Sequence, residues 1–189
     1  MAIDEIFDDK LLGAYADHFY GYGAYSGKYW FLGMEEGGGD AFSEVQSKLT
    51  TWNQHGRQEL EDLYSFHHDV GIRQWFRPQA KMQPTWSKFI RVLLSVKGEE
   101  ANAERVRDYQ AESLGRSAGE SCLMELLPLP APALDRWPYG QRSRLPQLVN
   151  RETYMAHYAP YRVEHIRTKL REHRPRAVVF SSIHARYRP

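Results

Sequence analysis

The stretch KYWFLGMEEGGGDAF, residues 28–42, decides how the chain folds. Its aromatic and apolar run has the length and composition of a buried strand, and it stops at two adjacent carboxylates and three glycines. Beyond the glycines, apolar residues recur at helical spacing at Phe42, Val45, Leu49 and Trp52, so a helix follows directly. The pattern predicts a strand, a glycine-rich loop and a helix whose first turn is capped by Asp40 or Ser43.

Two further apolar runs predict strands in the second half of the chain. They are SCLMELLPLPAP, residues 121–132, and PRAVVFSS, residues 175–182. Proline cannot continue a central strand, so Pro128, Pro130 and Pro132 predict that the chain leaves the sheet as an extended loop. With helices between the strands, we expect an α/β fold, a three-layer sandwich with a central parallel sheet.

The rest of the chain is expected to be helix, turn and loop. Four-residue spacing predicts a helix from Phe7 to Phe19, and GYGAYSG, residues 21–27, is typical of a turn-rich link. Further helices are predicted near residues 58–68, from QPTW onward, and from Val106 to Leu114. A long irregular loop runs to Asn150, and residues 151–173 are expected to be helical with a kink or break at Pro160.

Length and composition favour one globular domain spanning residues 1–189. Hydrophobic residues make up 42% and aromatic residues 13% of the chain, which argues against disorder. No apolar run approaches the ~20 residues of a membrane span, and the acidic N-terminus has no signal-peptide pattern. A single cysteine, Cys122, excludes an intramolecular disulfide, so a cytoplasmic location is the default expectation.

The net charge of +1 hides an asymmetry along the chain. Residues 136–189 hold 12 Lys or Arg against 3 Asp or Glu, a net +9, and residues 1–135 carry the opposing −8. Such a segment can form a phosphate-binding face, or it can be the solvated face of an Arg-rich helix. Eleven of the 12 basic residues are Arg, which favours phosphate contacts slightly.

Topology alone predicts a site at one edge of the sheet. In parallel sheets ligands bind beyond the carboxyl ends of the strands, where GMEEGGG and ELLPLPAP would meet. Glycines allow positive φ and close approach to a ligand, and the following helix start favours an anion. Glu35 and Glu36 repel phosphate, however, and a carboxylate there is better suited to be a general base, a metal ligand or a stabiliser of positive charge. The alternative is a glycine-rich turn with two solvated acids.

Other candidate residues carry weaker signals. His67 and His68 are adjacent and point to different faces, which favours a polar helix face over a metal site. Cys122 lies in an apolar run and is expected to be a small core residue. Trp137 and Tyr139 could stack on a base or cover the core, and the second interpretation is favoured.

Residues 33–37, Gly-Met-Glu-Glu-Gly, resemble the first motif of the uracil-DNA glycosylase superfamily. The resemblance places the family's water-activating or cation-stabilising acid at Glu35 and puts Glu36 where the family usually has proline. The family's base-reading residue, often Asn, falls at Glu125. An aromatic residue that stacks on the base falls at Phe42, with Trp52 as a second choice. The base- or phosphate-binding residues that the resemblance implies are Gly33, Met34, Glu36, Gly37, Gly38, Gly39, Phe42 and Glu125.

The resemblance implies a DNA N-glycosylase that hydrolyses the bond to a flipped-out base without a metal or cofactor. In this mechanism the N–H groups of Gly37 to Gly39 hold a base carbonyl or a flanking phosphate. Family members follow the third strand with a helix, a fourth strand and a histidine loop. Here Pro189 comes directly after the third strand and His184 is too early for that histidine, so we expect a chain truncated before its last strand.

Two other functions remain open from the sequence. One is a nucleic-acid-binding module that keeps the fold without the chemistry, which Glu125 at the base-reading position favours. The other is a metal-dependent hydrolase that uses Glu35, Glu36 and Glu125.

Overall fold

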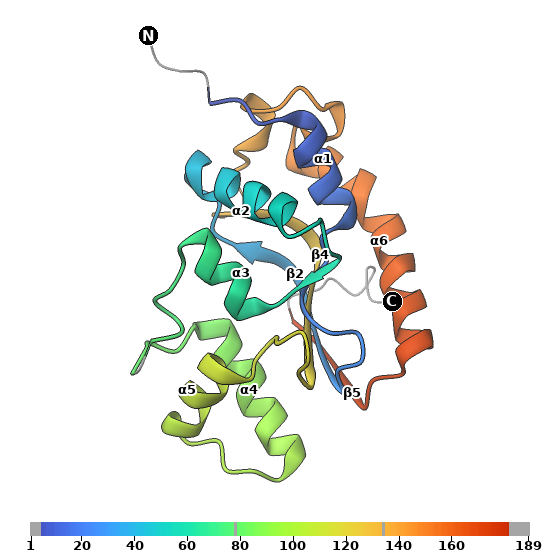
Figure 1. The fold of residues 1–189 in the computed structure, drawn as a ribbon. Coiled ribbons are helices and arrows are strands. Elements are labelled where there is room, and N and C mark those ends of the chain that lie inside the picture. Colours follow the sequence, from blue (N-terminus) through green and yellow to red (C-terminus); the bar gives the residue numbers. More distant parts are fainter. Residues whose placement is uncertain (1–4, 78, 134, 182–189) are drawn as a thin grey trace.

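The computed structural model describes residues 5–77, 79–133 and 135–181, and it has an α/β fold with helices on both sides of one sheet. In Figure 1, α6 runs along one side of the sheet and α2 to α5 lie on the other. The strands are β1 (Gly21–Gly23), β2 (Tyr29–Gly37), β3 (Leu60–Glu61), β4 (Ser121–Ala131) and β5 (Ala177–Phe180). The helices are α1 (Asp9–His18), α2 (Phe42–Gln54), α3 (Leu63–Val70), α4 (Pro84–Lys97), α5 (Ala103–Glu112) and α6 (Arg151–His173).

The sheet is mixed, with the strand order β3-β1-β4-β2-β5 in the described part of the chain. Among the three predicted strands, β2 lies in the middle and pairs parallel with both β4 and β5, as expected. The expectation of a wholly parallel sheet is wrong, because β1 pairs antiparallel with β4 and parallel with β3.

Strand β1 lies in the stretch that was expected to be a turn-rich link. Its glycines have positive φ, 143° at Gly21 and 103° at Gly23. A Cβ atom at these positions would lie 2.0 Å and 2.2 Å from the carbonyl oxygens of Leu123 and Ser121 on β4. The glycines therefore let a short strand approach β4 closely, and they do not mark a turn.

Strand β4 continues through Pro128 and Pro130, which corrects the prediction of a loop there. The pairing of β1 with β4 ends at Met124, so the second half of β4 needs fewer ladder hydrogen bonds on that side. Side chains satisfy the backbone there instead: the Tyr154 hydroxyl accepts from the Leu129 N–H, and the Tyr139 hydroxyl donates to the Pro130 carbonyl.

Helix α6 runs through Pro160 without a break. Asn150 caps its start by accepting from the Thr153 N–H at 2.8 Å. The loop before it contains two short 3₁₀ helices, Tyr139–Gln141 and Pro146–Leu148, so it is less irregular than expected.

One hydrophobic core extends over both faces of the sheet. Trp30, Phe31 and Leu32 of β2 are buried, as expected for this strand. Strand β5 is the last strand of the sheet among the described residues, and His184 lies outside them. No described helix is long and apolar enough to cross a membrane.

Candidate active site

The carboxyl ends of β2 and β4 meet at one edge of the sheet, as the topology predicted. Gly33 pairs with Glu125, and Glu35 pairs with Leu127. A Cβ atom at Gly33 would lie 2.0 Å from Oε2 of Glu125. The Glu125 carboxyl group therefore occupies the space that a side chain at position 33 would fill. Because Gly33 leaves this space free, the acids of β2 and β4 come together in one site.

Glu35 forms an ion pair with Arg151, the first residue of α6. The Glu35 side chain is 9% exposed and that of Arg151 is 15% exposed. Oε1 of Glu35 and Nη1 of Arg151 are both buried and have no hydrogen-bond partner among the described residues. Burial raises the pKa of Glu35 to about 7, against the opposing effect of Arg151. A carboxyl group with this pKa exchanges a proton readily at neutral pH.

Glu125 has a higher pKa than Glu35. Burial, and after it the nearby charges of Glu36 and Glu35, raise the pKa of Glu125 to about 8. Its Oε2 is buried without a hydrogen-bond partner in the described structure. Glu125 is therefore mainly protonated at pH 7, and a neutral carboxyl group offers one donor and one acceptor.

Glu36 pairs with Lys48 of α2 at 3.0 Å, and the Lys48 side chain is only 2% exposed. Each of the two acids of β2 is thus paired with a cation from a helix, Glu35 with Arg151 of α6 and Glu36 with Lys48 of α2. The interpretation of the loop as a turn with two solvated acids is therefore wrong, since neither acid depends on water alone for its charge.

The three acids line a narrow cavity of about 80 Å³. Aromatic and polar side chains of β1 and of α4 with its N-cap residue complete the lining. Its full lining is Tyr22, Glu35, Glu36, Gly37, Gln83, Thr85, Trp86, Phe89, Leu123 and Glu125. The Tyr22 hydroxyl is buried and has no described partner, so this cavity holds several polar groups ready for a ligand.

The glycine loop has the backbone conformation expected of it at two positions. Gly38 has φ 108° and Gly39 has φ 77°, whereas Gly37 still belongs to β2. A Cβ atom at Gly39 would lie 2.6 Å from the Pro130 carbonyl oxygen, so the loop lies directly against β4. The cap of α2 differs from the prediction: Ala41 stands at the N-cap with no side-chain hydrogen bond.

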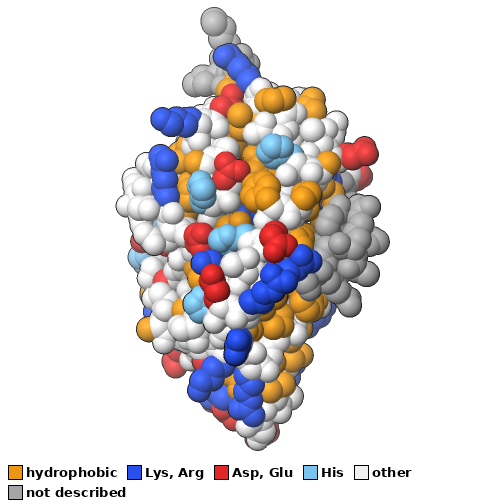
Figure 2. Space-filling model, turned by 90° about the vertical axis from the view of Figure 1, so that its right-hand side faces the viewer, with side chains coloured by type: hydrophobic (Ala, Val, Ile, Leu, Met, Phe, Trp, Pro, Cys, Tyr) orange, Lys and Arg blue, Asp and Glu red, His pale blue; other side chains and the backbone are white. Residues whose placement is uncertain are grey.

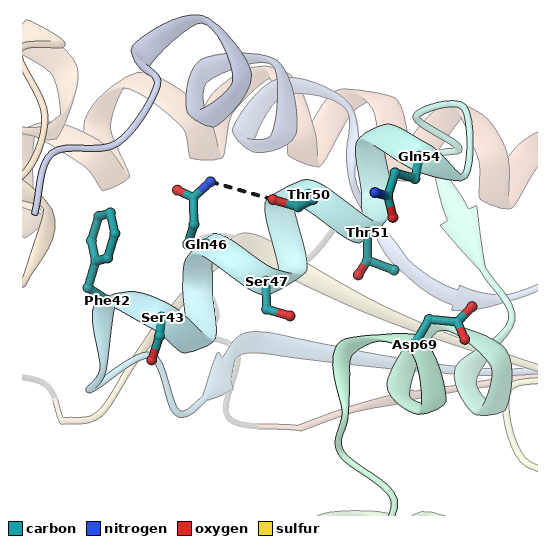
Figure 3. A pocket seen from close by; sticks show the side chains of 8 residues that line it. All are labelled: Phe42, Ser43, Gln46, Ser47, Thr50, Thr51, Gln54 and Asp69. Atoms are coloured by element: carbon teal, nitrogen blue, oxygen red, sulfur yellow. Dashed lines mark hydrogen bonds between the residues drawn. The ribbon is translucent and has the colours of Figure 1, made fainter.

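The predicted stacking residues lie away from the carboxylate cavity. The Phe42 ring stacks on Phe7 at 4.5 Å and lines a separate open hollow of about 460 Å³ along α2. Figure 3 shows this hollow, with Ser, Thr and Gln side chains of α2 facing it and Asp69 at one end. Trp52 is fully buried, and its indole N–H donates to the Gln58 carbonyl. Met34 is partly buried and packs against the core.

The weaker candidates fall mainly into structural roles. Cys122 is a buried free thiol, as expected. Tyr139 is buried and Trp137 donates to the Leu148 carbonyl at 2.7 Å, so both cover the core as favoured. The prediction that His67 and His68 lie on a polar helix face is only partly right. His67 is buried, and the side chain of His68 is 42% exposed. Burial lowers the pKa of His67 to about 4.

Arg151 and Lys48 were missed by the sequence analysis. They lie 116 and 12 residues from the acids they bind, and no local motif marks either pairing. Trp86 was expected only as part of a helical apolar face. In the described residues no group of three or more His, Cys, Asp or Glu side chains is arranged to hold a metal ion. Glu35, Glu36 and Glu125 therefore do not form a ready metal centre.

Half of the 12 basic residues in residues 136–189 are paired with acids in the folded chain. Figure 2 views the α6 side, where positive, negative and histidine side chains are interspersed above a group of Lys and Arg at the lower end. Six basic residues of this segment form ion pairs: Arg136, Arg142, Arg151, Arg167, Lys169 and Arg171. Arg162 is fully buried, and Arg186 and Arg188 lie outside the described residues.

Comparison with protein-family models, curated proteins and solved structures found no significant match to this chain.

Proposed function

We propose that the chain is an N-glycosidic hydrolase that acts on a base turned out of a nucleic acid, with Glu35 as the catalytic carboxylate. The observation that carries this proposal is the buried Glu35–Arg151 pair at the carboxyl end of β2, with a Glu35 pKa of about 7. The proposal includes a fold of the uracil-DNA-glycosylase kind, with which the parallel arrangement of β4, β2 and β5 is compatible.

In the proposed reaction, ionised Glu35 takes a proton from water as the water oxygen bonds to the anomeric carbon. The bond between sugar and base breaks, and its electron pair leaves with the base. The transition state carries positive charge on the sugar, which the Glu35 carboxylate stabilises. Arg151 keeps a share of Glu35 ionised at neutral pH, because the charge of its guanidinium group opposes the effect of burial on the Glu35 pKa.

Glu125 fits the base-reading role better as a neutral acid than as a carboxylate. With a pKa of about 8 it keeps its proton at pH 7, so it presents one O–H donor and one carbonyl acceptor. This is the same donor and acceptor pair that an amide side chain offers to a base edge. The donor would also stabilise negative charge on the departing base, together with the N–H groups of Gly37 to Gly39.

The test uses two isosteric substitutions in the same site. Oligonucleotides carrying uracil, hypoxanthine or xanthine, single- and double-stranded, are incubated with the protein and scored for alkali-labile sites. Glu35→Gln should reduce the rate about 100- to 1000-fold, the usual cost of removing one preorganised charged or donor group. Glu125→Gln should stay within about tenfold of the unmodified protein at pH 7, because Gln mimics the protonated acid.

Unchanged base release by Glu35→Gln, with circular dichroism showing intact folding, would remove Glu35 from the mechanism. A large loss in Glu125→Gln at pH 7 would instead mean that Glu125 acts as a carboxylate or transfers a proton.

The second candidate is a nucleic-acid-binding module without chemistry, and the size of the cavity favours it. At about 80 Å³ the cavity has room for a few water molecules, well below the 300 Å³ or more of typical small-molecule sites. A base enters only if the first turn of α4, which supplies Thr85 and Trp86, moves away. Salt-dependent oligonucleotide binding without base release by any of the substrates would support this candidate.

A further inference from the structure

A second hollow, on the α3 side of the molecule, combines aromatic rings with uncompensated arginines. It has a volume of about 210 Å³ and is lined by Tyr64, His68, Arg73, Phe76 and Arg77. We call it the Tyr64 pocket. It is larger than the carboxylate cavity and contains none of the residues that line that cavity.

The positive charge of the Tyr64 pocket is not cancelled by acids. Among the described residues, Arg73 and Arg77 form no ion pair with a carboxylate, whereas five arginines of residues 136–189 do. Arg73 donates only a long hydrogen bond, 3.4 Å, to the His68 carbonyl. Two exposed guanidinium groups beside one hollow are suited to bind a phosphate, because each offers several donors in a planar fork.

The aromatic side chains of the pocket offer a surface for a flat ligand. Tyr64 is 37% exposed, and its ring lies 5.3 Å from Phe76 in an edge-on arrangement. The Arg116 guanidinium packs against the Tyr64 ring at 4.8 Å while it pairs with Asp62, which holds the ring in place. Exposed rings interleaved with arginines are the combination by which proteins bind single-stranded nucleic acid.

The Tyr64 pocket and the carboxylate cavity share a wall. Phe76 lines the pocket, Trp86 lines the cavity, and the two ring centroids are 6.1 Å apart. The buried His67 ring packs against both, at 5.9 Å from Phe76 and 5.4 Å from Trp86. A wall formed by two aromatic rings is thin enough for one strand to place neighbouring nucleotides on its two sides.

We propose that the Tyr64 pocket binds one nucleotide of a single-stranded nucleic acid, its base against Tyr64 and Phe76 and its phosphate on Arg73 and Arg77. The pocket itself is a binding site whether or not the chain is an enzyme. Its further role, holding the nucleotide that flanks the one in the carboxylate cavity, rests on the proposed function.

The first test measures binding of a fluorescently labelled ten-residue oligothymidylate by anisotropy at several salt concentrations. Arg77→Gln should weaken binding about tenfold and reduce the salt dependence by about one phosphate contact, near 0.7 in the logarithmic slope. The matched control is Arg171→Gln, which removes one exposed Arg charge from α6 and should change neither quantity. Equal losses in the two variants would mean diffuse electrostatic attraction and would overturn the proposal.

The second test separates stacking from charge. Tyr64→Ala should weaken oligothymidylate binding about tenfold, within the range of one lost base–aromatic stack, and leave an abasic oligomer of the same length unaffected. Tyr64→Phe keeps the ring and should bind like the unmodified protein. If Tyr64→Ala weakens both ligands equally, or neither, no base lies on this ring and the proposal fails.

The experiments distinguish a failure of the Tyr64 pocket from a failure of the proposed hydrolase function. Binding that depends on Tyr64 and Arg77 in a protein that releases no base supports the Tyr64 pocket and removes the hydrolase. Base release that is insensitive to Arg77→Gln and Tyr64→Ala, with unchanged oligonucleotide affinity, supports the hydrolase and removes the pocket.

Discussion

The proposed chemistry depends on the protonation state of one residue, Glu35. Its pKa of about 7 is set by burial and opposed by Arg151. Since ionised Glu35 and protonated Glu125 are the active forms in the proposed mechanism, the rate should rise with pH through about 7 and fall again above about 8. Replacing Arg151 by Gln removes the favourable charge, so the Glu35 pKa should rise and the ascending limb should move to higher pH.

A pH–rate profile of base release checks this prediction, with Arg167→Gln as the control. Arg167 lies on the same helix and pairs with Glu164 on the surface, so its loss should leave the limb in place. An Arg151→Gln profile with the ascending limb unmoved would show that another group sets the pH dependence.

At the residue scale, the sequence identified the acids of the site but not the residues that surround them. Glu35 and Glu125 stand out because each is a carboxyl group at the end of an apolar run. Their environment does not, because the burial of both acids and the Arg151 cation that pairs with Glu35 depend on segments distant in sequence. The protonated state of Glu125 depends on the absence of a side chain at Gly33 and on the approach of Glu36 and Glu35, which only the folded chain defines.

At the element scale, Arg162 ties α6 to α1 and to β4. The side chain is fully buried, and its guanidinium donates to backbone carbonyls of Ala16, Phe19, Glu125 and Leu126. Two of these carbonyls belong to the chain around the end of α1, where the helix dipole favours a cation. Arg162→Met should lower the free energy of unfolding by about 3 kcal/mol, because several buried carbonyls lose their donors.

Urea denaturation followed by circular dichroism measures this loss. Arg167→Met, on the exposed part of the same helix, is the control and should change stability by less than about 0.5 kcal/mol. If the two variants are equally stable, the carbonyls find other donors and Arg162 does not hold the elements together. Because Arg162 also binds the Glu125 carbonyl, its loss should in addition reduce base release more than Arg167→Met does.

The elements differ in how far the sequence predicts them. β2 and α2 follow from local patterns, because β2 is a continuous apolar run of strand length and the apolar residues of α2 recur at helical spacing. β1 and β3 were missed, since three and two residues are too few to show a period and glycine in β1 resembles a turn. The prolines of β4 led to a wrong prediction of a loop. A strand can contain proline where its neighbouring strand has ended, and the end of β1 is set by the sheet and not by the local sequence of β4.

At the scale of the whole molecule, folding redistributes charge that is segregated along the chain. The basic residues of α6 and the preceding loop find acids from several elements, including Glu5, Glu35 and Asp40. Two arginines in the acidic part of the sequence, Arg73 and Arg77, have no such partner among the described residues, although they lie beside the same pocket. The phosphate-binding face that the sequence slightly favoured thus falls in a segment where six of the 12 basic residues form ion pairs, because ion pairing between distant segments leaves no local pattern.

One core supports the expectation of a single domain, and cooperative unfolding tests it. The same cluster of buried residues includes Trp30 on β2, near His173 of α6, and Trp52 on α2, against Tyr15 of α1. Tryptophan fluorescence thus reports on both sides of the sheet, and circular dichroism at 222 nm reports on the helices. In urea the two signals should change together in one transition with the same midpoint, as expected when neither side keeps a core of its own. Two separated transitions would show that α4 and α5, or α6, unfold as an independent unit, and the acids and Arg151 would then belong to a site assembled from two parts.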